Sequence, residues 1–103
     1  MRDSVTIPAT ANYVQQGAGS PVILIHGIAA SLHDWDDLIP ALAGSGHACF
    51  APDLLGHGDS PKPDSRSYHM EWLVGHFCNW MQSLRLTEPA VLIGHSLGGY
   101  IAL

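Results

Sequence analysis

The stretch Gly94-His95-Ser96-Leu97-Gly98 is the part of the chain whose residue types could do chemistry. Gly-x-Ser-x-Gly is typical of a sharp turn between a strand and a helix that presents a serine hydroxyl as a nucleophile. Large side chains in place of Gly94 and Gly98 would clash where the strand and the helix close around the serine. The pattern by itself is modest evidence, because a chain with 11 glycines carries it by chance about one time in ten.

The segments that flank Ser96 predict this turn. Residues 89–93 form a short apolar run, Pro-Ala-Val-Leu-Ile, which is typical of a buried strand. Residues 98–103 have the character of the first turns of a packed helix. A strand, a turn and a helix therefore meet at Ser96, and this context distinguishes the motif from a glycine-rich loop with an incidental serine.

The rest of the chain alternates between predicted strands and helices. Alternation from residue 22 onward implies an α/β fold, in which a parallel sheet is covered by helices on both faces. Ligands of such sheets bind beyond the carboxyl ends of the strands, where we expect His26-Gly27, Asp53 and Ser96. The predicted strands are residues 3–7, 11–15, 22–25 and 48–51, and the predicted helices run from 31 to about 44 and from 68 to 86.

Each of these two helices has an apolar face. At the start of the first, Ser31 and Asp34 have the spacing of a capping box, with the shorter acid in place of glutamate. We expect Trp35 and Trp80 to pack in the core rather than to line a binding groove. The apolar residues recur at helical spacing; they are Trp35, Leu38, Ile39 and Leu42 in the first helix and Leu73, Phe77, Trp80, Met81 and Leu84 in the second.

The composition argues against several classes of protein. With 47% hydrophobic and 13% charged residues the chain is globular, and the low charged fraction favours part of a larger domain. A net charge of −5 with four unclustered bases argues against a nucleic-acid partner. No apolar stretch approaches the roughly 18 residues of a membrane span, and residues 1–8 do not resemble a signal peptide. Cys49 and Cys78 lack C-x-x-C spacing, so we expect buried free thiols and a cytoplasmic location.

Three motifs together resemble the α/β-hydrolase fold superfamily. They are His26-Gly27 followed by Trp35, then Asp53-x-x-Gly56-x-Gly58-x-Ser60, and then Gly94-His95-Ser96-Leu97-Gly98-Gly99. The resemblance covers nearly the whole chain but only the first half of a typical member. Residues 1–103 are thus expected to be the amino-terminal half of such a domain, a partial fold without the late strands and the cap. The motifs look most like those of small esterases, lactonases, carbon–carbon bond hydrolases and perhydrolase-type enzymes.

The resemblance implies roles for particular residues. Ser96 would be the nucleophile that forms an acyl-enzyme, and the backbone N–H groups of Leu97 and Ile28 would stabilise the oxyanion. His26, Gly27 and His95 would lie near the substrate, with His26 mainly bracing the loop. A serine at this position argues against the haloalkane dehalogenase and epoxide hydrolase branches, which have aspartate there. No cofactor is implied.

The histidines and acids of the chain are expected to have structural roles. His95 would mainly pack beside Ser96, His57 would be structural or near the pocket rim, and Asp53 would shape the turn after its strand. None of the histidines has the spacing of metal ligands, so we expect no metal site. The remaining histidines, His33, His47, His69 and His76, are expected on the surface or on helices.

The superfamily places the acid and the histidine of its catalytic triad after the serine, and residues 97–103 contain neither. We therefore expect the isolated chain to have essentially no hydrolase activity. The first interpretation is the amino-terminal part of a serine-dependent hydrolase of a small ester, lactone, thioester or related carbonyl substrate; acyl transfer shares the same intermediate. The second is a non-catalytic remnant or assembly module that self-associates through the strand edge at 90–93. A third is complementation by a separate chain.

Overall fold

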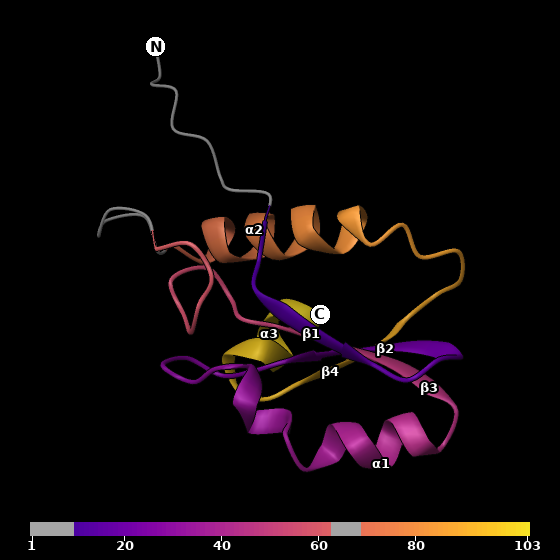
Figure 1. Cartoon of the computed structure of the whole chain (residues 1–103). Coiled ribbons are helices and arrows are strands. Elements are labelled where there is room, and N and C mark those ends of the chain that lie inside the picture. The colour runs from indigo at the N-terminus through magenta and orange to yellow at the C-terminus, as the bar shows by residue number, and fades with distance from the viewer. Residues whose placement is uncertain (1–9, 63–68) are drawn as a thin grey trace.

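The computed structural model describes residues 10–62 and 69–103 as a four-stranded sheet between helices (Figure 1). The strand expected at residues 3–7 lies outside the described residues. In chain order the elements are β1 (Tyr13–Gln16), β2 (Ser20–Ile25), the 3-10 helix η1 (Leu32–Trp35), α1 (Leu38–Gly44), β3 (His47–Pro52), α2 (Met70–Ser83), β4 (Val91–Gly94) and α3 (Leu97–Ala102).

The sheet has the order β1-β3-β2-β4, so β2 lies in its interior, between β3 and β4. β2 runs parallel to both β3 and β4, with Val22 opposite Cys49 on one side and opposite Val91 on the other. β1 is antiparallel to β3. The parallel α/β architecture expected from residue 22 onward is therefore confirmed, and the carboxyl ends of β2, β3 and β4 meet at one edge.

Alternate residues of β2 face opposite sides of the sheet, as the period of a strand requires. Ile23 and Ile25 join a core cluster with the buried side chains of α2 and α3. Val22 and Leu24 join a second cluster with η1 and α1. Figure 1 shows α2 and α1 on opposite faces of the sheet. Because both faces are covered, β2 is apolar at every position from Pro21 to Ile25 rather than alternating with polar residues.

The helix expected from residue 31 to about 44 is divided into η1 and α1. Ser31 caps η1 as expected, since its Oγ accepts a hydrogen bond from the His33 N–H at 3.2 Å. Pro40 explains the division, because a proline has no N–H to donate and is tolerated only in the first turn of a helix. A continuous helix would place Pro40 in its interior. As a result Leu38, expected on the buried face, is 37% exposed.

The apolar face of α2 is largely the one expected from its spacing. Leu73, Phe77 and Trp80 are buried, whereas Met81 and Leu84 are half-buried and pack against the cluster from its margin. His76 is buried among them, and its Nε2 lies 2.7 Å from the Thr10 carbonyl oxygen. A histidine with one hydrogen-bond partner thus takes a core position that hydropathy alone does not assign to it.

β4 is the last strand of the sheet and, among the described residues, pairs only with β2. Val91 at its start is 59% exposed. Within residues 10–62 and 69–103, no helix has the length and apolar character needed to cross a bilayer.

Leu24→Ala should lower the free energy of unfolding by about 2–5 kcal/mol, because Leu24 is fully buried and its removal leaves a cavity between the sheet and α1. Urea unfolding followed by circular dichroism measures this loss. The matched control is Leu38→Ala, which should cost less than half as much because Leu38 is partly exposed. Equal losses for the two variants would contradict the deeper burial of Leu24.

Candidate active site

Ser96 is held in an unusual backbone conformation between β4 and α3. Its φ of 56° and ψ of −114° lie outside the regions that a residue with a side chain normally adopts. Such conformations persist only where the surroundings enforce them, and they are concentrated at functional sites. Here the His95 N–H donates to the Ile25 carbonyl at 3.1 Å and the Tyr100 N–H donates to the Ser96 carbonyl at 3.2 Å. The turn is thereby fixed on both sides of an exposed serine side chain.

Two glycines allow the strand and the helix to approach each other at this turn. A Cβ atom on Gly98 would overlap the carbonyl oxygen of Ile25 on β2, and one on Gly94 would overlap the backbone of Gly98. Any side chain at either position would separate α3 from the sheet. The strained serine conformation and the two glycines are therefore parts of one packing arrangement.

The loop after β2 lies directly against the serine. A Cβ atom on Gly27 would be 3.5 Å from the Ser96 Cβ and 3.3 Å from the His95 carbonyl oxygen. Gly27 thus brings the next residue, Ile28, beside the serine, and the Ile28 side chain is 68% exposed. The loop then turns at Ala29, whose φ is 60°.

The N–H groups of Ile28 and Leu97 are suited to stabilise negative charge near Ser96. Leu97 is the first residue of α3, where backbone N–H groups have no partner within the helix. Among the backbone hydrogen bonds of the described residues, neither the Ile28 N–H nor the Leu97 N–H has an acceptor. Both groups lie next to the serine in space or in sequence. Fixed backbone donors of this kind lower the energy of a developing oxyanion.

His26 is fully buried and contacts backbone atoms of two loops. Its Nε2 accepts a hydrogen bond from the Leu54 N–H at 3.0 Å, and its Nδ1 lies 2.6 Å from the Gly27 carbonyl oxygen. Burial lowers the pKa of His26 and outweighs the opposing effect of the hydrogen bond to Gly27. The side chain is therefore neutral and braces the loop, as the sequence suggested.

Asp53 ties three segments to the end of β3. Its carboxylate accepts hydrogen bonds from the Leu32 N–H at 2.8 Å, the Asn12 side-chain amide at 2.9 Å and the Asp59 N–H at 2.9 Å. Burial alone would raise the pKa of Asp53, but the hydrogen bonds to its charged form outweigh burial and lower the pKa. Asp53 shapes the turn after β3, as expected, and its carboxylate accepts from two backbone N–H groups and one side-chain amide.

His95 has an exposed side chain one residue before the serine. With Asp34 and Trp35 it lines an open cavity of about 370 Å³. This cavity lies at the edge of the sheet where β2 and β4 end, and His95 in its lining precedes Ser96 in the chain. Trp35, expected in the core, is only half-buried because it forms one wall of the cavity.

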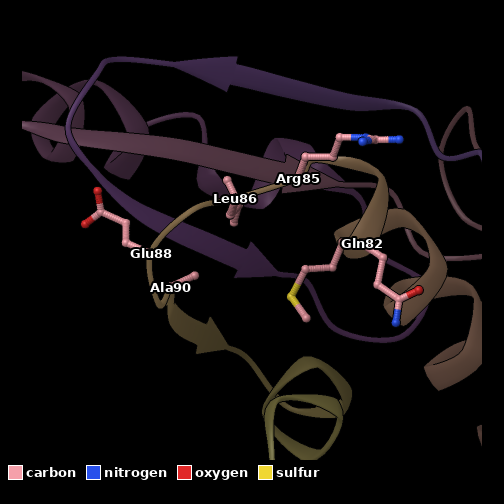
Figure 2. A pocket seen from close by; sticks show the side chains of 6 residues that line it. Gln82, Arg85, Leu86, Glu88 and Ala90 are labelled. Carbon is pink, nitrogen blue, oxygen red and sulfur yellow. The ribbon is translucent and has the colours of Figure 1, made fainter.

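A second cavity, of about 290 Å³, lies at the opposite end of β4 (Figure 2). Its lining includes Gln82 and Arg85 near the end of α2 and Ala90 just before the strand. Because Ser96 follows the carboxyl end of β4 whereas this cavity adjoins its amino end, the two are separated by the strand. The cavity is therefore not part of the serine site.

Among the described residues, Ser96 has neither a hydrogen-bonded base nor a cluster of metal-ligating side chains beside it. None of their hydrogen bonds engages the Ser96 hydroxyl, and no group of three or more His, Cys, Asp or Glu side chains among them could hold a metal ion. His57, the other histidine near this edge, directs its Nδ1 to the Leu55 carbonyl oxygen at 2.9 Å. His57 therefore acts as a structural residue of its loop.

Comparison with known proteins finds similarity over most of the chain. A family model described as the alpha/beta hydrolase fold matches residues 20–103. The chain is 36% identical over 91 residues to a bifunctional epoxide hydrolase 2 of Sus scrofa. This match covers 87% of this chain and 16% of that protein. The chain is also 34% identical over 105 residues to a 2-hydroxymuconate semialdehyde hydrolase of Pseudomonas sp. (strain CF600). This match covers 99% of this chain and 36% of that protein.

The structure is also similar to a thioesterase domain from the curacin biosynthetic pathway, with a TM-score of 0.82 and 31% identity. That match covers 87% of this chain and 34% of the thioesterase domain. The chain thus spans between 16% and 36% of the length of these three proteins. Each of these three proteins is therefore longer than 103 residues.

Gly98→Ala should lower the free energy of unfolding by more than about 2 kcal/mol, since the added Cβ meets the Ile25 carbonyl oxygen and must displace α3. Gly44→Ala is the matched control. No atom lies within 4 Å of a Cβ added there, and alanine is favoured over glycine in a helix by about 0.5–1 kcal/mol. Thermal unfolding of both variants checks the expected opposite signs, and a neutral Gly98→Ala would refute the tight packing at this turn.

Asp53→Asn should destabilise the protein at pH 7 by about 1–3 kcal/mol, because the amide cannot accept all the hydrogen bonds of the carboxylate. A lowered pKa means that the stabilisation by Asp53 is present above the unfolded value of about 4 and is lost as the pH falls below it. The difference between the variant and the original protein should therefore shrink below about pH 4.

Urea unfolding between pH 7 and pH 3 measures this convergence. The control is Asp37→Asn, an exposed position at which the free energy of unfolding at pH 7 should change by no more than about 0.5 kcal/mol. A difference that stayed constant down to pH 3 would show that the ionised carboxylate of Asp53 is not the stabilising species.

Proposed function

Because the chain belongs to the α/β-hydrolase fold family, we propose that Ser96 is the nucleophile of a hydrolase that acts through an acyl-enzyme. The substrate is a small ester, lactone, thioester or related carbonyl compound. The observation that carries this proposal is the Ser96 backbone, with φ of 56° and ψ of −114°, at a turn between β4 and α3. That conformation exposes the hydroxyl beside the two N–H groups of Ile28 and Leu97.

The reaction follows from this geometry. The Ser96 oxygen attacks the carbonyl carbon of the substrate, and the carbonyl oxygen becomes an oxyanion that the N–H groups of Ile28 and Leu97 stabilise. Collapse of this intermediate breaks the bond to the leaving group and leaves an ester on Ser96, which water then hydrolyses. The cavity beside Asp34, Trp35 and His95 would hold part of the substrate.

The serine proton needs a base, which this proposal places outside residues 1–103. In the superfamily both triad partners follow the serine, and residues 97–103 include no acid and no histidine. The relatives matched are also much longer, since the chain spans 36% of the semialdehyde hydrolase. The chemistry requires no cofactor or metal. The free thiols of Cys49 and Cys78 agree with a cytoplasmic location for the enzyme.

Epoxide hydrolysis is the second candidate, because the chain is similar to a protein named as an epoxide hydrolase. The residue type at position 96 favours the first. A carboxylate that opens an epoxide gives an ester, which water can cleave. A serine hydroxyl that opened an epoxide would give an ether, which is inert to hydrolysis under mild conditions, so Ser96 would be consumed after one turnover.

Assembly without catalysis is a third candidate, supported by the open edge of β4. In the described part of the chain this edge pairs with nothing beyond β2, and an exposed strand edge can pair with a second copy. A dimer that forms through β4 and shows no turnover would favour this function over hydrolysis.

The test is expression of the complete reading frame and assay with p-nitrophenyl acetate, a small thioester and styrene oxide. Turnover of the acyl substrates should fall by about 10⁶-fold in Ser96→Ala, or to the background rate. Ser45→Ala, at the exposed end of α1, should keep full activity. The 103-residue chain assayed alone should be inactive. Turnover of the epoxide without turnover of the esters, or ester turnover that survives Ser96→Ala, would overturn the proposal.

A further inference from the structure

The loop that carries Ile28 is tied at both of its ends to one dipeptide, Asp53-Leu54. At the start of the loop, Nε2 of His26 accepts a hydrogen bond from the Leu54 N–H at 3.0 Å. At its end, the Leu32 N–H donates to Oδ1 of Asp53 at 2.8 Å. Both side chains are buried, with His26 at 0% and Asp53 at 2% exposure. The two bonds fix the span of the loop against the end of β3.

The bond to Leu54 also determines the proton position on His26. A backbone N–H can only donate, so Nε2 must carry a lone pair and no proton. A neutral imidazole then has its proton on Nδ1, which lies 2.6 Å from the Gly27 carbonyl oxygen. His26 therefore donates to Gly27 while accepting from Leu54. A charged imidazole would leave the Leu54 N–H facing another donor.

The hydrogen bond to the Gly27 oxygen sets the direction of the Ile28 N–H. These two groups belong to the same peptide unit, which is planar and trans, so its C=O and N–H bonds point in opposite directions. With the oxygen held by His26 on one side, and by the Ala30 N–H at 3.3 Å, the N–H must point to the other. The segment that adjoins Gly27 is the dipeptide His95-Ser96, since a Cβ added to Gly27 would lie 3.3 Å from the His95 carbonyl oxygen and 3.5 Å from the Ser96 Cβ.

We propose that His26 and Asp53 are positioning residues that aim the Ile28 N–H at the oxyanion, with the Nδ1–H of His26 as the group that sets its direction. This inference rests on the proposed acyl-transfer function of Ser96. The loop needs such restraint because Ala29 has a φ of 60°, a strained value that the loop would otherwise relax. Asp53 fixes the far end of the loop, and His26 fixes the peptide plane.

The two hydrogen bonds of His26 can be separated by substitution. The side-chain amide nitrogen of asparagine and Nδ1 of histidine are the same number of bonds from Cβ. His26→Asn therefore keeps the donor to Gly27 and loses the acceptor for Leu54. The side-chain oxygen of glutamine and Nε2 of histidine are the same number of bonds from Cβ. His26→Gln therefore keeps the acceptor for Leu54 and loses the donor to Gly27. A purely structural role predicts similar damage from both, whereas a positioning role predicts that only His26→Gln impairs catalysis.

The first measurement is the state of the ring in the original protein. A long-range ¹H–¹⁵N spectrum at pH 7 of the protein expressed from its complete reading frame should show His26 as neutral and protonated on Nδ1. The spectrum of His26→Asn identifies the signal by its absence. A His26 protonated on Nε2, or on both nitrogens, would overturn the inference without any activity measurement.

The second measurement is the kinetics of p-nitrophenyl acetate hydrolysis. His26→Gln should lower kcat by about 10²-fold with KM within about threefold of the original value, because a misaligned donor acts on the transition state and not on binding. His26→Asn should keep kcat within about tenfold. Unfolding curves of both variants establish that both are folded under the assay conditions.

Equal losses of kcat in the two variants, or a larger loss in His26→Asn, would overturn the inference while leaving the function of Ser96 in place. If the original protein shows no turnover, or turnover that does not depend on Ser96, the proposed function itself is overturned. The two failures are distinguishable because the first is seen only in variants and the second is seen before any substitution at His26.

Discussion

The buried carboxylate of Asp53 is the interaction on which the arrangement of this edge of the sheet depends. Removing a charged group from water is costly unless hydrogen bonds replace its hydration. Here the replacements come from Asn12, Leu32 and Asp59, which lie in three different segments of the chain. Those segments must therefore converge on the end of β3 for the carboxylate to be buried at all.

Convergence on Asp53 links the fold to the candidate active site. The segment before β1 and the start of η1 are drawn to the same carboxylate, and the Ser60 hydroxyl donates to the Asp53 carbonyl oxygen at 2.6 Å. A Cβ atom on Gly58 would overlap the carboxylate itself, so the glycine of the turn is required by this burial. The loop next to Ser96 is thus held by charge and hydrogen bonding rather than by apolar packing.

Apolar packing has a different role, which is to bring the serine turn to the same place. Ile101 of α3 is buried with Ile23 and Ile25 of β2, and this contact presses α3 onto the sheet. The glycines at 94 and 98 permit the approach, and the serine between them takes up the strain. Polar and apolar forces therefore act on separate loops, and the site lies where those loops meet.

The sequence determined the order of the elements, the parallel sheet and the position of the serine turn. Local patterns predict these features: apolar runs bounded by glycine and proline, and a motif whose residues are adjacent in the chain. Sequence spacing also predicted most of the buried face of α2. It failed at Leu38, because Pro40 is tolerated only in the first turn of α1 and the helix is therefore divided before Leu38. The position of the proline in the sequence could have indicated that break.

Only the tertiary structure decided the roles of the histidines and of Asp53. His26, His76 and His95 have the same side chain, yet one braces a loop, one fills the core and one borders a cavity. Their partners are up to 66 residues away in the chain, so no local pattern reports them. Which hydrogen bonds a buried polar group makes depends on segments that meet only in the folded state, and those bonds set its charge, its tautomer and its function.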